Sequence, residues 1–206
     1  MLRLRAGEAV TVADGRGGWR ACEFVPGRGL SPTGDVEHRP RLEPAVSVAF
    51  ALTKSEKPEL TVQKLTELGV DRIIPFVAGR SVVRWDAERA ARNVDRLRRV
   101  AREAAMQSRR AYLPEVSEVV RFADVVAQPG ASRADAGGAP PSLDHPLVLV
   151  GPEGGWTDEE RSTTVPVIGL GTQVLRAETA AITAGALLTA LRAGLVRHAG
   201  SLPLGS

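Results

Sequence analysis

Two glycine-containing segments have the residue types and spacing of ligand-binding loops. The first is Gly151-Pro152-Glu153-Gly154-Gly155, and the second runs over residues 170–180. Each follows a short apolar run typical of a buried strand and leads towards a helix, the position at which open α/β sheets bind ligands. Because glycine has no Cβ, the backbone of such a loop can approach a flat ligand closely. Simple turns are the structural alternative for either segment taken alone.

The charge around the first loop argues against a phosphate ligand. A Walker loop needs Lys-Ser/Thr after its glycines and a dinucleotide-binding turn needs G-x-G-x-x-G, and the chain has neither pattern there. The loop instead carries Glu153 and is followed by Asp158, Glu159 and Glu160, which would repel a polyphosphate. A positively charged sulfonium ligand fits this charge distribution better.

Composition restricts the class of protein. Of the 206 residues, 43% are hydrophobic and 25% are charged, as in ordinary globular domains. No apolar run reaches the roughly 18 residues of a membrane-spanning helix, and the first residues lack the apolar core of a signal peptide, so a cytoplasmic protein is predicted. One cysteine and three widely spaced histidines predict neither a disulfide framework nor a metal site.

Basic residues slightly exceed acidic ones, and most of them are arginine. The 27 Lys and Arg against 24 Asp and Glu give a net charge of +3, which is weak support for a polyanionic partner. With only 4% aromatic residues, any nucleic-acid binding would depend on arginine. One side of the helix predicted over 86–110 carries Arg89, Arg92, Arg96, Arg99 and Arg102. This spacing indicates either a solvated helix face or an RNA-facing surface.

Residues 45–206 show the alternation of strands and helices that is typical of an α/β domain. Strands are predicted over 46–52, 73–77, 81–83, 147–150 and 165–170, and helices over 58–68, 86–110, 157–160 and 178–197. The last helix should bury a stripe formed by Leu187, Leu191 and Leu195. Residues 128–145 are rich in Ala, Gly, Pro and Ser, which predicts a mobile surface loop with little function.

Residues 1–44 predict a separate small β module. Leu2, Leu4, Val10 and Val12 have strand character, and a turn over 14–18 precedes a strand over 19–25. Residues 26–44 are rich in Gly, Pro and charge and are predicted to be loop. Because three or four strands scarcely close a barrel, the module should be incomplete or lean on its neighbour.

Five motifs in order along residues 54–186 resemble those of the RsmE family of ribosomal RNA methyltransferases. They are Gln63-Lys64-x-x-Glu67-Leu68-Gly69-Val70; Pro75 with Arg80-Ser81-Val82; Arg102-Glu103-Ala104-Ala105-x-Gln107-Ser108-x-Arg110 with Pro114; GPEGG; and LGxxxLRAETA. Each motif alone is weak evidence for the family, but five motifs in the family's order are specific to it. Two departures stand out: Met106 replaces a residue that is usually acidic, and the N-terminal module starts abruptly at a strand, as though some leading residues of the family were missing.

The resemblance implies an S-adenosylmethionine-dependent enzyme that methylates N3 of a uridine in the 16S ribosomal RNA of the small ribosomal subunit. It also implies a SPOUT-type fold, in which the C-terminal part of a parallel α/β sheet over 45–206 is tied in a deep trefoil knot. Residues 1–44 would be a PUA-like, RNA-binding β-barrel module. Family members are homodimers, with the cofactor site near the knot and the subunit interface.

The same resemblance assigns two walls of a pocket for the methyl donor. The first would contain Leu149, Gly151, Pro152, Glu153, Gly154 and Gly155. The second would contain Leu170, Gly171, Val174, Leu175, Arg176, Thr179 and Ala180. Backbone amides would read the adenine edge, and Val174 and Leu175 would supply apolar contact.

Arg176 and Glu178 are the catalytic candidates that the resemblance suggests. Arg176 could stabilise a developing uridine anion. Glu178 could accept the N3 proton, although a carboxylate beside an arginine is a weak base. Positioning and anion stabilisation are therefore favoured over a dedicated strong base. Hydrogen bonds that stabilise the knot are an equal alternative for Arg176, Glu178 and Thr179.

RNA capture would involve the N-terminal module and a set of basic side chains. These are Lys54, Lys57, Lys64, Arg80, Arg84, Arg109 and Arg110. Phosphate contacts give affinity without sequence information, so selection of one uridine would need RNA shape and a flipped base. Three alternatives stay open: a SPOUT methyltransferase with another RNA target, a non-catalytic knotted RNA-binding protein, and a nucleotide-binding α/β protein, which the acidity of the first loop disfavours.

Overall fold

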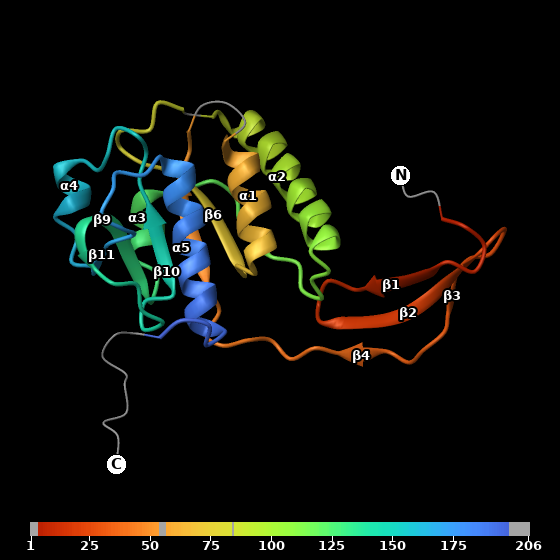
Figure 1. Ribbon diagram of the computed structural model, residues 1–206. Coiled ribbons are helices and arrows are strands. Elements are labelled where there is room, and N and C mark those ends of the chain that lie inside the picture. The colour runs from red at the N-terminus through yellow and green to blue at the C-terminus, as the bar shows by residue number, and fades with distance from the viewer. Residues whose placement is uncertain (1–3, 54–56, 84, 198–206) are drawn as a thin grey trace, which may run out of the picture.

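The computed structural model describes residues 4–53, 57–83 and 85–197, which form two sheets (Figure 1). The N-terminal sheet is antiparallel and projects from the larger body. It contains β1 (Ala9–Ala13), β2 (Gly18–Val25), β3 (Gly29–Pro32) and β4 (Glu37–His38), in the order β1-β2-β3 with β4 also pairing β2. Asp14 shapes the predicted turn between β1 and β2, because its Oδ1 accepts hydrogen bonds from the amides of Arg16 and Gly18.

The second sheet is built from parallel strand pairs, in the order β11-β9-β10-β5-β6-β7 with β8 beside β6. Its strands are β5 (Ser47–Ala51), β6 (Arg72–Val77), β7 (Glu115–Val116), β8 (Val120–Arg121), β9 (Ala131–Ala139), β10 (Leu147–Val150) and β11 (Val167–Ile168). The predicted α/β class with a parallel sheet is confirmed. Because the strands run in one direction, the loops that follow β6, β10 and β11 lie at the same edge of the sheet.

Helices cover both faces of this sheet (Figure 1). They are α1 (Lys57–Leu68), α2 (Ala87–Gln107), α3 (Phe122–Val126), α4 (Asp158–Arg161) and α5 (Ala177–Arg192). Val48 and Phe50 of β5 pack with residues of α1, α2 and α5, whereas Ala49 and Ala51 belong to the core on the other face, together with residues of α3. The central strand therefore reads as a continuous apolar run, as expected for a strand buried on both faces.

The ends of three helices match the sequence prediction. Asp86 caps α2 by accepting a hydrogen bond from the amide of Arg89. Gly69, with φ of +94°, follows the last residue of α1. Thr157 and Glu160 form the predicted capping box at the start of α4, each side chain accepting from the other residue's amide.

The prediction for residues 128–145 is wrong. Residues 131–139 form β9, which lies inside the sheet between β10 and β11 and buries Ser132 and Arg133. A Cβ added to Gly138 would lie 2.6 Å from the amide nitrogen of Gly169, so only glycine permits the close approach of β9 and the chain at β11. The sequence of this segment has no apolar periodicity that would predict a strand. The segment is a strand because it pairs with the neighbouring strands β10 and β11.

Two smaller predictions are also wrong, and a third is correct only in part. Residues 81–83 form no strand; instead, the side chain of Ser81 accepts a hydrogen bond from the amide of Ala78 in a turn. The strand over 165–170 is reduced to β11. The loop predicted over 26–44 contains β3 and β4. Leu2 lies outside the described residues, and Leu4 precedes β1 without joining it.

The C-terminal helix differs from its prediction in length and in its buried face. It ends at Arg192, and Gly194 with φ of +69° follows. Its buried residues are Ala181, Ala184, Gly185 and Leu188. The expected stripe is therefore only partly covered: Leu187 and Leu191 are half-buried, and Leu195 is 80% exposed. The described residues contain no helix long and apolar enough to cross a membrane.

The two sheets meet at residues 111–113, which follow α2. The amide of Gly17 donates to the carbonyl of Ala111, and the amide of Leu113 donates to the carbonyl of Gly15, both at 3.0 Å. The Tyr112 hydroxyl donates to the carbonyl of Arg39 at 2.9 Å. The N-terminal sheet is thus attached to the body by backbone pairing beside the end of α2.

Candidate functional site

Two loops at the carboxyl edge of the parallel sheet are tied to each other. The loop after β6 contains Gly79 and Arg80, and the loop after β10 contains residues 151–157. The amide of Gly79 donates to Oε1 of the buried Glu160 at 2.8 Å, and Nη1 of Arg80 donates to the carbonyl of Gly154 at 3.1 Å. Glu160 also accepts from the amide of Thr157 at 2.8 Å. Glu160 and Arg80 therefore hold the two loops in a defined relative position.

The glycine at the start of the first predicted loop is required by packing inside the protein. A Cβ on Gly151 would lie 2.9 Å from the Trp156 ring, which is buried. The Trp156 ring is parallel to that of Phe76, with 6.2 Å between centroids, and its Nε1 donates to the carbonyl of Ala134 at 2.9 Å. Trp156 thus sets the backbone position of this loop, whose Glu153 and Gly154 face solvent.

A buried charged network supports Trp156 from β9. Arg133 is only 4% exposed, and its guanidinium lies 5.7 Å from the centroid of the Trp156 ring. Its Nη1 pairs with Asp135 at 2.8 Å, and its Nη2 donates to the carbonyl of Arg161 at 3.3 Å. The side chain of Arg161 pairs with the same Asp135 carboxylate. The network joins β9 to α4 across the first loop.

Sequence reasoning missed Arg133 and Asp135 because it interpreted residues 128–145 as a loop with little function. The spacing of these two residues does indicate a possible ion pair. Residues two apart on a strand lie on the same face, so opposite charges at positions 133 and 135 can pair. Without a strand prediction for this segment, that signal could not be used.

The second predicted loop is open to solvent. Gly171 has φ of +145°, and a Cβ added there would meet nothing within 4 Å. Val174 is fully exposed, whereas Leu170 and Leu175 are partly buried. The exposed Val174 offers an apolar surface, and the space around Gly171 is open. This part of the loop therefore has room for a flat ligand.

The catalytic candidates lie at the start of α5, directly after this loop. Arg176 is the N-cap residue, and its carbonyl accepts from the amide of Ala180 at 2.8 Å. Its side chain is exposed and forms no ion pair with any described residue. Glu178 is half-buried in the first helical turn, where the positive end of the helix dipole stabilises a carboxylate, and Thr179 is exposed. The predicted loops therefore follow β10 and β11 at one edge, as the sequence suggested.

Arg110 is bonded to the body of the protein, which favours a structural role over its predicted role in RNA binding. Its Nη1 donates to the carbonyls of Thr66 and Val70, both at 2.9 Å, and its Nη2 lies 4.0 Å from Asp71. Burial lowers the pKa of Arg110. These two hydrogen bonds from Nη1 hold the guanidinium against carbonyls at the end of α1.

The other basic candidates differ in their surroundings. Arg109 is exposed and has a left-handed backbone, with φ of +54°. Lys64 pairs with Glu67 at 2.8 Å, and Arg80 borders the first loop as described above. Lys54, Arg84 and the side chain of Lys57 lie outside the described residues.

Some arginines along α2 form ion pairs with nearby carboxylates, and others do not. Arg92 pairs with Glu88, and Arg96 pairs with Glu59 of α1 at 3.1 Å, as in a solvated helix face. Arg89 and Arg102 are exposed and form no ion pair within the described ranges. The same part of the chain contains no cluster of three or more His, Cys, Asp or Glu side chains that could hold a metal ion.

Comparison with known proteins defines first a class and then a family. Residues 40–189 match the family model for an RNA methyltransferase domain. Ribosomal RNA small subunit methyltransferase E from Mycobacterium bovis is 34% identical, with 88% of this chain and 78% of the relative aligned. The enzyme of that name from Synechocystis is 30% identical over 93% of this chain and 69% of its own. The chain belongs to the ribosomal RNA small subunit methyltransferase E family.

Solved structures share the fold over almost the whole chain. A putative methyltransferase from Legionella pneumophila, in complex with S-adenosylmethionine, has a TM-score of 0.78 and 28% identity over 91% of this chain and 85% of its own. Ribosomal RNA small subunit methyltransferase E from Neisseria gonorrhoeae, also bound to S-adenosylmethionine, has a TM-score of 0.74 and 27% identity over 92% and 86%. The fold of this chain is therefore one that binds this methyl donor in other proteins.

Proposed function

We propose that this chain is an S-adenosylmethionine-dependent methyltransferase that acts on N3 of a uridine in 16S ribosomal RNA of the small ribosomal subunit. The observation that carries the proposal is the arrangement of the loops after β6, β10 and β11 at one edge of the sheet. Glu160 and Arg80 hold the first two loops together, and the third leads directly into Arg176 and Glu178. Membership in the methyltransferase family indicates that the reaction at these loops is methyl transfer.

The residues present fit a sulfonium donor. Gly171 has free space where a side chain would stand, and the exposed Val174 supplies an apolar surface beside it. The exposed carboxylates of Asp158 and Glu159 follow the first loop, and their charge suits a cation and opposes a polyphosphate. The two walls that would hold the donor are residues 149–155 and 170–180.

Arg176 and Glu178 would serve the acceptor side of the reaction. When bound, S-adenosylmethionine supplies a methyl group on a positively charged sulfur. The uracil ring must lose its N3 proton and align N3 with that methyl group. The exposed guanidinium of Arg176 would stabilise the uracil anion. Glu178, half-buried at the helix start, would orient the ring or accept the proton.

The finer fold assignment is also part of the proposal. A SPOUT-type trefoil knot over the C-terminal part is supported by the strand order, in which β9 lies between the later strands β10 and β11. The close passage of Gly138 and Gly169 is a further support. Residues 1–44, with their small antiparallel sheet, would be the PUA-like RNA-binding module, and residues 45–206 the methyltransferase domain.

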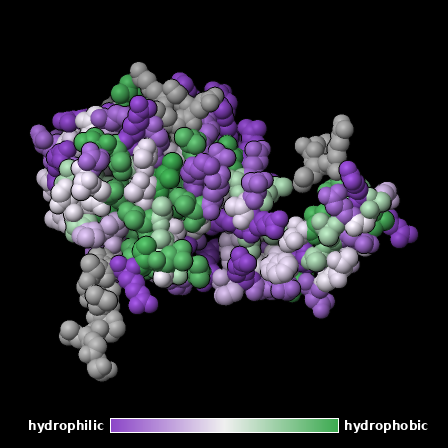
Figure 2. Space-filling view, viewed as in Figure 1, coloured by the Kyte–Doolittle hydropathy of each residue, from purple (hydrophilic) through white to green (hydrophobic). Residues whose placement is uncertain are grey.

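We also propose that the chain works in the cytoplasm as a homodimer that uses the outer face of α5. Leu187 and Leu191 are only half-buried there, and Figure 2 shows hydrophobic surface gathered over this part of the molecule. Covering such a surface favours association. Analytical ultracentrifugation should show a dimer that Leu187→Glu weakens. A monomeric wild-type chain at micromolar concentration would contradict this assignment.

Calorimetric titration with S-adenosylmethionine, with ATP as the control ligand, tests the donor site. Saturable binding of the donor and none of ATP is expected, because the acidic loop repels a polyphosphate. Binding of ATP alone would replace the proposal with a nucleotide-binding protein. Binding of neither would favour a non-catalytic RNA-binding protein.

Transfer of labelled methyl groups to unmethylated small ribosomal subunits tests the acceptor. A methyl group on N3 blocks the Watson–Crick edge of uracil, so reverse transcription should stop one nucleotide before the modified position. Transfer without such a stop would indicate a different atom or nucleotide as the target. Of the side chains that the sequence analysis assigned to RNA capture, Lys64, Arg80 and Arg109 are at least partly exposed and are candidates for RNA contact in this assay.

A further inference from the structure

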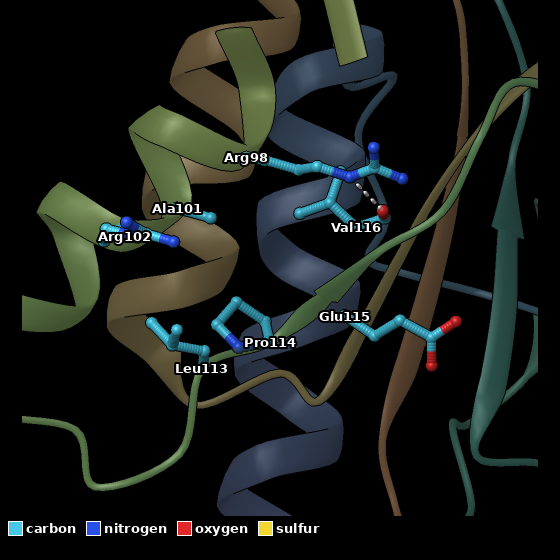
Figure 3. Close-up of a pocket in the computed structure, with 7 residues that line it drawn as sticks. All are labelled: Arg98, Ala101, Arg102, Leu113, Pro114, Glu115 and Val116. Carbon is cyan, nitrogen blue, oxygen red and sulfur yellow. Dashed lines mark hydrogen bonds between the residues drawn. The ribbon is translucent and has the colours of Figure 1, made fainter. Parts of the chain in front are cut away.

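A groove of about 340 Å³ separates α2 from the chain segment that follows it (Figure 3). Ala101, Pro114 and Val116 are buried and form its floor, and the partly exposed Leu113 stands at its edge. Pockets for small ligands have volumes of roughly 300–1,000 Å³, so the groove has room for one group the size of a nucleoside. None of its lining residues belongs to the donor loops described above.

Arg98 forms one rim of the groove and is fixed in place. Its Nε donates to the carbonyl of Val116 at 3.2 Å, and its Nη2 pairs with Glu118 at 2.7 Å. The hydrogen bond that Arg98 donates to the Glu118 carboxylate raises the pKa of Arg98. Figure 3 shows this side chain reaching from α2 towards the carbonyl of Val116. Its charge is therefore paired with a carboxylate at the protein surface.

Arg102 lies one helical turn further along α2 and is available to a ligand. It is exposed, lines the groove and forms no ion pair within the described part of the chain. The lining carboxylate, Glu115, pairs with Arg72 at 3.4 Å, and Figure 3 shows it directed away from α2. The uncompensated charge at the groove is thus positive.

The groove borders the attachment point of the N-terminal sheet. Leu113 lies directly against Gly15, where an added Cβ would approach its side chain to 2.8 Å. The backbone of the neighbouring Tyr112 forms an isolated antiparallel β-bridge with that of Arg16, and the guanidinium of Arg41 lies over the Tyr112 ring, 4.8 Å from its centroid. Two exposed arginines, Arg16 and Arg41, therefore lie beside the attachment point.

We propose that this groove binds one unpaired nucleotide of the substrate RNA. The base packs against Leu113 and the floor of the groove, and the phosphate contacts Arg102. The inference rests on the proposed function, because it assigns a contact for that RNA away from the donor site. An apolar floor with an arginine at its rim matches the base and phosphate of a single strand, whereas a paired base has no free face to insert.

Charge reversal at Arg102 tests the proposal. The full-length chain is titrated with purified 16S ribosomal RNA at several salt concentrations, as wild type, as Arg102→Glu and as Arg92→Glu. Arg92 is a matched control on the same helix, since it is exposed and already paired with Glu88. Arg102→Glu should weaken RNA binding roughly tenfold and lower the slope of log K against log salt by about one, beyond any change in the control.

The affinity for S-adenosylmethionine separates this inference from the proposed function. Arg102→Glu should leave that affinity unchanged, because Arg102 lies outside the donor loops. Equal loss of RNA affinity in Arg102→Glu and Arg92→Glu would overturn the groove assignment while leaving the methyltransferase intact. A wild-type chain that binds the donor but not the RNA would overturn both the groove assignment and the RNA substrate.

Discussion

Oε1 of Glu160 accepts a hydrogen bond of 2.8 Å from the amide of Gly79, which lies 81 residues earlier in the chain. The other oxygen of the same carboxylate accepts from the amide of Thr157. A Cβ on Gly79 would come within 2.7 Å of the Thr157 side chain, so the two loops touch at this point. The loop after β6 and the loop after β10 therefore act as one unit at the candidate donor site.

Glu160→Gln should loosen this unit. The amide side chain has one acceptor oxygen in place of two, so one buried backbone N–H loses its partner, at a cost of about 1–3 kcal/mol. We expect the urea unfolding midpoint to fall and the affinity for S-adenosylmethionine to decrease. The control is Glu159→Gln, which removes the same charge from an exposed position in the same helical turn. Equal effects of the two substitutions would show that charge, not the hydrogen bonds, matters.

Asp135→Asn should destabilise the protein by about 3 kcal/mol, because it leaves the buried Arg133 without its counter-charge. The double variant Arg133→Met/Asp135→Asn should recover part of this loss, since it removes the uncompensated charge. Arg161→Ala, at a half-exposed position, should cost under about 1 kcal/mol. Chemical denaturation measures all three. A double variant less stable than Asp135→Asn would contradict this account.

Gly138→Ala should prevent the normal approach of β9 and β11. Its Cβ would lie within 2.6 Å of backbone atoms of residues 168 and 169, and overpacking against backbone costs roughly 1–3 kcal/mol or more. Gly34→Ala is the control, because a Cβ there meets only the Ala21 methyl at 3.8 Å. Thermal unfolding should separate the two variants clearly. Similar melting temperatures would mean that the strands can move apart at little cost.

Gly171→Ala should weaken donor binding by altering the backbone of the second loop. The φ of +145° is unfavourable for any residue with a Cβ, at about 1–3 kcal/mol. Gly27→Ala imposes a related penalty at φ of +78°, also with open surroundings, in the turn between β2 and β3. Calorimetry should show reduced affinity for S-adenosylmethionine only in Gly171→Ala. Reduced affinity in both variants would indicate a general loss of folding.

Arg176→Ala should reduce turnover more than donor binding. Removing one stabilising donor from a developing anion costs roughly a hundredfold in rate, while contacts to the methyl donor stay in place. Single-turnover methylation rates and the dissociation constant for S-adenosylmethionine are the two measurements, with Arg92→Ala as an exposed control. If both quantities fell to the same extent, Arg176 would be a residue of the donor pocket or of the fold.

Local signals identified most elements of this protein correctly. Asp86 and Gly69 mark helix ends through capping and a left-handed backbone, which depend on neighbouring residues alone. The apolar runs of β5, β6 and β10 are strands buried on both faces. The outer leucines of α5 were misassigned, because a helix that is apolar on several sides does not indicate which side faces the core.

The parallel α/β class, the positions of the two glycine loops and, through five ordered motifs, the family could be predicted from the residues alone. The three-dimensional packing was needed to show that residues 131–139 are a strand, that Arg133 and Asp135 form a buried pair, and that Arg110 bonds to carbonyls of the protein body. These features differ because the interactions that determine them act over different separations along the chain. Caps and apolar periodicity act within a few residues, whereas β9 is stabilised by strands whose residues lie far from it in the chain.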